Sequence, residues 1–117
     1  MIHFEFEVKK SDEKINFLYQ VQYDPSYPYQ NIWLKYKLSA PGGAELVQAK
    51  DNLFLFDPAS GKPTGEYSKK KNYKLAYFLK EVVLEKKGKY TIDIHHYMRP
   101  EKLEGIQSLG LVLERLP

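Results

Sequence analysis

The feature of this sequence that most constrains its fold is an alternation of apolar and other residues with a period of two. Between positions 14 and 23, for example, Ile15, Phe17 and Tyr19 occupy every second position. Successive side chains of a β-strand point to opposite faces, so such a run predicts a strand with one face in the core and one in water. The pattern recurs in five runs: His3 to Lys9, Lys14 to Tyr23, Asn31 to Leu38, Lys89 to Tyr97 and Leu109 to Leu116.

Two further segments are less regular. Residues 53–56 (LFLF) are continuously apolar, which is typical of a strand buried on both faces. Residues 75–84 also fit a helical stripe, but their aromatic and β-branched content favours a strand. Glycine- and proline-rich turns separate the runs at short intervals, and one helical turn is expected from Pro100 to Leu103. The sequence therefore predicts one all-β domain over residues 1–117, an antiparallel jelly-roll-like β-sandwich of seven or eight strands.

The composition excludes several classes of protein. The chain has 117 residues and no cysteine, which rules out a disulfide framework and a thiolate metal site. Lysine and arginine number 18 against 15 acidic residues, and this mild balance does not indicate a nucleic-acid-binding protein. No apolar run approaches the roughly 18 residues that a membrane-spanning helix needs, and no secretory signal is present.

The sequence offers little support for a catalytic or metal site. His95 and His96 are neighbours on a predicted strand, so they point to opposite faces and do not readily share one ion. Asp93 and His95 share a face, as residues on a solvated sheet face often do. The basic run at positions 69–71 is interpreted as a solvated loop. We therefore expect no enzymatic activity, no cofactor and no metal.

The main candidate for a binding site is a cluster of aromatic residues around a proline-containing loop. Tyr27, Tyr29 and Trp33 lie within seven positions, and Trp33 falls between residues predicted to be in the core. Trp33 is therefore expected to point outward. An exposed aromatic residue on a sheet can anchor a protein partner or stack on a sugar, or the loop of Tyr27 and Pro28 can cover it as part of the structure.

Several segments resemble those of a known family. The segment YPYQNIWL at 27–34 and the loop at 57–65, with its aspartate and spaced glycines, are similar to segments of the gliding-motility lipoprotein GldH family of Bacteroidetes. The end of the chain is also similar: GKYT at 88–91, YMR at 97–99, LEGI at 103–106 and LGLVLE at 109–114. The resemblance spans about residues 14 to 116 of the chain.

This resemblance implies a non-enzymatic lipoprotein of the cell envelope, periplasm-facing or at the outer membrane. Such a domain would be tethered by an N-terminal lipid and would serve the gliding or secretion apparatus by binding a protein partner. The sequence has neither a signal peptide nor a lipid-bearing cysteine, so we expect a mature domain from which both have been removed. The predicted binding residues are Tyr27, Tyr29, Trp33 and, within the terminal motif, Arg99. The alternative function is a carbohydrate-binding module that uses the exposed aromatic residues.

Overall fold

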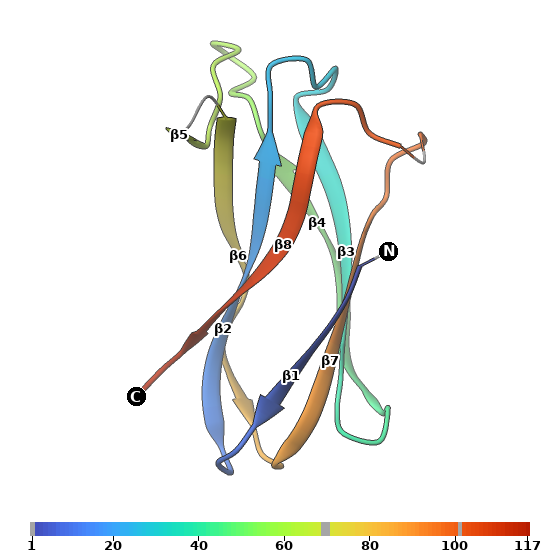
Figure 1. The fold of residues 1–117 in the computed structure, drawn as a ribbon, viewed down its shortest axis with the longest axis vertical. Coiled ribbons are helices and arrows are strands. Elements are labelled where there is room, and N and C mark those ends of the chain that lie inside the picture. The colour runs from blue at the N-terminus through green and yellow to red at the C-terminus, as the bar shows by residue number, and fades with distance from the viewer. Residues whose placement is uncertain (1, 69–70, 101) are drawn as a thin grey trace.

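The computed structural model describes residues 2–68, 71–100 and 102–117, and these form eight β-strands and no helix. Two four-stranded antiparallel sheets face each other, and the molecule measures 44 × 30 × 24 Å (Figure 1). The strands are β1 (Ile2–Val8), β2 (Glu13–Tyr23), β3 (Asn31–Ser39), β4 (Glu45–Phe54), β5 (Glu66–Ser68), β6 (Lys71–Leu84), β7 (Gly88–His96) and β8 (Ile106–Arg115). The predicted antiparallel β-sandwich is thereby confirmed.

Strands of the first sheet and strands of the second sheet are intermixed in the order of the chain. The first sheet has the strand order β1-β7-β3-β4 and the second has the order β5-β6-β2-β8. The chain therefore passes from one sheet to the other at every connection except β3–β4 and β5–β6. Such crossings are what bring strands distant in sequence side by side, as with β1 and β7.

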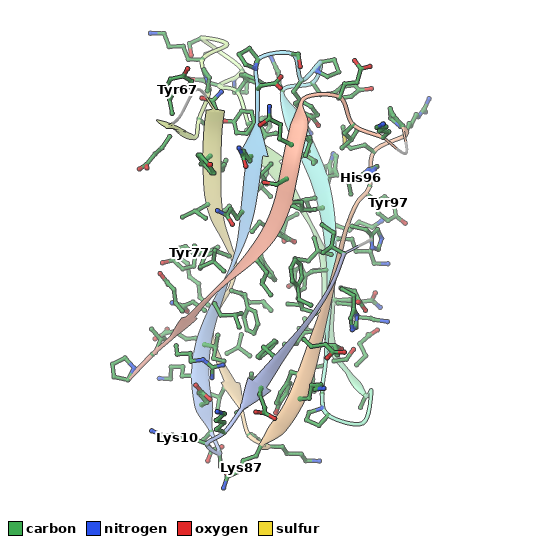
Figure 2. All side chains as sticks on the ribbon, viewed as in Figure 1. Lys10, Tyr67, Tyr77, Lys87, His96 and Tyr97 are labelled. Carbon is green, nitrogen blue, oxygen red and sulfur yellow. The ribbon has the colours of Figure 1, made fainter. Side chains whose placement is uncertain are left out.

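The alternating runs supply the core between the sheets. Ile32, Leu34 and Leu38 of β3 are almost completely buried, and they face Phe17 and Tyr19 of β2 as members of one cluster. Residues 75–84 belong to β6, which confirms the strand prediction for that segment. Figure 2 shows the side chains that fill the space between the sheets. The period-two pattern therefore separates inward from outward side chains, as expected.

One prediction about another segment is wrong, and two more reach outside the described residues. The segment at 53–56 is not a strand buried on both faces, because β4 is the edge strand of its sheet and Phe54 is 42% exposed. Only Leu53 and Leu55 of this segment are deeply buried. The expected helical turn from Pro100 to Leu103 includes residue 101, and the basic run includes residues 69 and 70. Both predictions thus extend outside the described residues.

Much of the high tyrosine content is structural. The buried hydroxyl of Tyr23 donates to the carbonyl oxygen of Leu55 at 2.6 Å, and that of Tyr90 donates to the carbonyl oxygen of Lys86 at 2.8 Å. The Tyr19 hydroxyl donates to the Asp51 carboxylate at 2.8 Å. Burial, together with this hydrogen bond, raises the pKa of Tyr19. These rings fill the core while their hydroxyl groups keep a polar partner, as buried tyrosines require.

The loops at one end of the sandwich are held together by close packing. The loop from residue 24 to 30 and the β7–β8 connection meet where the Asp24 amide donates to the Gly105 carbonyl oxygen at 2.9 Å. A Cβ atom at Gly105 would lie 2.5 Å from the backbone nitrogen of Tyr27, and the Gly105 φ is +88°. Glycine is therefore required there, and the loop that leads into β3 has a defined position.

Candidate binding face

The outer face of the first sheet is built from the residues that alternate with its core. On β3, Trp33 and Lys35 point away from the core, and Lys50 of β4 lies directly opposite Lys35. On the other side of β3, His95 of β7 is paired with Lys35, and the Tyr97 amide donates to the Trp33 carbonyl oxygen at 2.7 Å. We call these five side chains, Trp33, Lys35, Lys50, His95 and Tyr97, the aromatic–lysine face.

Both large aromatic residues of this face are accessible to a partner. Trp33 is 42% exposed and Tyr97 is 52% exposed. The Lys50 Nζ atom lies 3.9 Å from the centroid of the Tyr97 ring, and the Lys35 Nζ atom lies 5.9 Å from it. The His95 ring centroid is 6.0 Å from that of Tyr97. Figure 2 shows Tyr97 projecting away from the sandwich, so its ring is presented to the surroundings.

The charges of the face are distributed unevenly. In the part of the chain that the structure describes, neither Lys35 nor Lys50 has a carboxylate within ion-pair distance. Burial, together with the nearby Lys35 ammonium, lowers the pKa of His95, which favours the neutral imidazole. The positive charge therefore lies over β3 and β4.

The β1 side of the same sheet carries paired acidic and basic groups. Glu5 and Asp93 flank His3, whose Nδ1 atom is 2.5 Å from Asp93 Oδ1 and whose Nε2 atom is 3.5 Å from Glu5 Oε1. Lys89 completes the group at 3.4 Å from Glu5. The hydrogen bond to Asp93 raises the pKa of His3. The outer surface of the sheet thus changes from basic over β4 to a mixture of paired acidic and basic groups over β1 and β7.

The four residues predicted as a binding site differ in exposure. Trp33 points outward as expected, and Tyr29 is 39% exposed on the loop before β3. Tyr27, in contrast, is only 4% exposed, and its hydroxyl donates to the Asn31 carbonyl oxygen at 2.7 Å. Burial raises its pKa to about 12. Tyr27 therefore supports the loop, and its ring contacts that of Tyr29 at 5.6 Å. Arg99 is exposed two positions after Tyr97.

The sequence analysis missed Tyr97 and Lys50 as neighbours of Trp33. The alternation of side chains along the chain could have indicated that Tyr97 points outward, because it continues the outward positions of Asp93 and His95. The register between β3 and its two neighbours brings these side chains together, and that register joins segments more than ten residues apart. It cannot be read from one run alone.

The second sheet offers a useful contrast. Its outer face exposes Tyr77, whose hydroxyl donates to Glu114 at 2.8 Å, and the Lys80 Nζ atom lies 4.9 Å from the Tyr77 ring centroid. Figure 2 shows Tyr77 on the side of the molecule opposite Tyr97. Here the tyrosine hydroxyl already has an acidic partner, so this face is a natural internal control for the aromatic–lysine face.

Two hollows in the surface lie away from the aromatic–lysine face. An apolar groove of about 590 Å³ opens between β4 and β6 and is lined by Leu46, Leu79 and Val83, among others. A polar hollow of about 740 Å³ lies at the β1–β2 turn beside Arg115. No group of three or more His, Cys, Asp or Glu side chains within the described ranges is arranged to hold a metal ion. No helix of the described residues is long and apolar enough to cross a membrane.

The fold and this face define a small β-sandwich domain with aromatic and basic side chains presented on one sheet. The sequence model described as GldH lipoprotein matches residues 1–113, so the chain belongs to the GldH lipoprotein family. This is a family of cell-envelope lipoproteins associated with gliding motility and is not a known enzyme family. The expected family is thereby confirmed. Neither a curated protein nor a solved structure matches the chain.

Proposed function

We propose that this domain is a non-enzymatic part of a gliding-motility or secretion assembly and that it docks a protein partner through the aromatic–lysine face. The domain would act at the cell envelope, periplasm-facing or at the outer membrane, where an N-terminal lipid tethers it. The observation that carries the proposal is the exposure of Trp33 on β3 and of Tyr97, which directly follows β7 and is hydrogen-bonded to Trp33 through the backbone.

Aromatic side chains of this kind are suited to binding a protein. Tryptophan and tyrosine dominate the energetics of interfaces because they bury a large area and lose little conformational freedom. Here the backbone hydrogen bond from Tyr97 to Trp33 fixes the strands that carry them, and the Met98 sulfur accepts a hydrogen bond from the Trp33 amide at 3.5 Å. The two residues are therefore presented on a rigid support, which lowers the entropic cost of association.

The proposal is tested by affinity capture from detergent-solubilised envelopes of the source organism. We expect Trp33→Ala and Tyr97→Ala to reduce capture of one defined envelope protein by at least about tenfold, since hot-spot residues are each worth about 2 kcal/mol or more. Tyr77→Ala on the opposite sheet is the matched control and should leave capture unchanged. Equal capture by the wild type and both face variants would remove this face from the docking site.

A glycan ligand is the second candidate, because Asn52 lies directly opposite Trp33 and places an amide beside an exposed ring. Rings with adjacent polar groups are typical of sugar-binding surfaces. A glycan array probed with the wild type and with Trp33→Ala distinguishes the two functions. Binding of a defined glycan that depends on Trp33 would favour the carbohydrate-binding function over protein docking.

A further inference from the structure

The most informative feature outside the family assignment is a pair of like charges at the centre of the aromatic–lysine face. Lys35 and Lys50 are directly opposite each other on β3 and β4. Like charges at directly opposed positions of an antiparallel pair destabilise the sheet. Both ammonium groups also lie over the same ring, that of Tyr97, at 5.9 and 3.9 Å. The face therefore concentrates positive charge around one exposed aromatic residue.

We propose that the occupant of this face is a short acidic segment of the protein partner. Its carboxylates contact the ammonium groups of Lys35 and Lys50, and an apolar side chain of the segment lies against Trp33 and Tyr97. This inference rests on the proposed docking function and adds the chemistry of the ligand. Carboxylates offset the repulsion between the two lysines, whereas a neutral ligand leaves it in place.

The surrounding charges favour one placement of the segment. Glu5 of β1 and Asp93 of β7 already contact the basic groups of that region, His3 and Lys89, so those groups are less available to a ligand carboxylate than Lys35 and Lys50 are. His95 lies on β7, the strand between β1 and β3, and its lowered pKa favours the neutral imidazole. An acidic segment is therefore expected to lie over β3 and β4 and not to extend toward β1.

The dimensions of the face favour a segment over a folded domain. It spans three strands and two rows of side chains, about 10 Å by about 7 Å between backbone positions. A stable interface between folded proteins buries roughly 800 Å² on each partner, which is far more than this footprint. An extended segment of about four residues matches it. Such a small contact is expected to bind weakly on its own.

The test uses the 117-residue chain and two synthetic peptides with blocked ends. The first has five residues with aspartates flanking a central leucine, and the second has asparagines in place of the aspartates. Trp33 is the single tryptophan of the sequence, so its indole N–H resonance is an unambiguous reporter of binding. We expect the acidic peptide to shift this resonance and the amides of β3 and β4, with a roughly millimolar dissociation constant. Raising the salt to about 0.5 M should weaken binding.

Lysine variants then test the role of charge. Lys35→Gln and Lys50→Gln should each weaken binding of the acidic peptide by about two- to fivefold, as expected for one exposed ion pair. Lys80→Gln is the matched control, because Lys80 also lies over a tyrosine ring but on the opposite sheet. Binding of the asparagine peptide with equal affinity would overturn the inference. So would an equal effect of Lys80→Gln, or shifts confined to the second sheet.

Two further probes separate other anionic occupants. Vesicles containing about 30% phosphatidylglycerol, and an acidic oligosaccharide such as oligogalacturonate, are titrated under the same conditions. Tighter, Lys35-dependent binding of either would overturn the assignment to an acidic protein segment. Failure of the acidic-segment inference is distinguishable from failure of the docking function. If envelope capture depends on Trp33 while both peptides bind equally, docking stands and only the acidic character of the ligand is wrong.

Discussion

The division of β3 into a core face and a binding face predicts opposite consequences for two adjacent residues. Leu34 is completely buried within the core cluster, whereas Lys35 belongs to the outer face. Replacing a buried leucine with alanine costs about 2–5 kcal/mol, because the transfer free energy is lost and a cavity remains. A substitution at an outward position such as Lys35 usually changes stability by less than about 1 kcal/mol.

The magnitude can be expressed as a shift in melting temperature. A two-state domain of this length has an unfolding entropy of about 0.25 kcal/mol/K, so each kcal/mol corresponds to about 4 °C. Leu34→Ala should therefore lower the melting temperature by about 8–20 °C, and Lys35→Ala by less than about 4 °C. Urea titration followed by circular dichroism gives the free energies, and an unchanged m value confirms that the same surface is exposed on unfolding. A cost below about 1 kcal/mol for Leu34→Ala, or equal costs for both variants, would refute the assignment of faces.

Two further predictions concern protonation and the loop end. In an NMR titration, His3 should titrate above 6.5 and His95 below it, because the hydrogen bond to Asp93 raises the pKa of His3 and burial lowers that of His95. The raised pKa of His3 contributes stability that is fully present below pH 6.5 and is lost as the pH rises through the folded-state value, so His3→Gln should reduce stability at pH 5.5 more than at pH 9. Equal pKa values for the two histidines, or a higher pKa for His95 than for His3, would contradict this account. Gly105→Ala should destabilise the domain by about 1–3 kcal/mol more than Gly61→Ala in urea titrations, since both have positive φ but only Gly105 packs against a backbone. Equal costs would show that this contact is not constraining.

The sequence predicted the fold well because the deciding information is local. Alternation along each run assigns inward and outward side chains, so both the burial of Leu34 and the exposure of Trp33 follow from parity. The four-residue apolar segment at 53–56 misled this reasoning, because a continuous run does not reveal that its strand lies at the edge of a sheet. Phe54 is consequently exposed, although its neighbours Leu53 and Leu55 are buried.

The binding face was only partly predictable because its members come from three strands. Trp33 was identified from one run, but its neighbours are fixed by the registers of β3 with β4 and β7, which depend on long-range pairing. Proximity along the chain was a poor guide in this case. Tyr27 is six residues from Trp33 and lies in the core, whereas Tyr97 is distant in sequence and lies beside Trp33.

The claim that one face of this sandwich docks a protein partner is tested most directly by site-specific photocrosslinking in living cells. A photoreactive amino acid replaces Trp33 in one strain and Tyr77, on the opposite sheet, in another. We predict a single covalent adduct with one envelope protein from position 33 and none from position 77. Adducts from position 77 alone, or no adduct from position 33 in a properly folded and localised protein, would contradict the account.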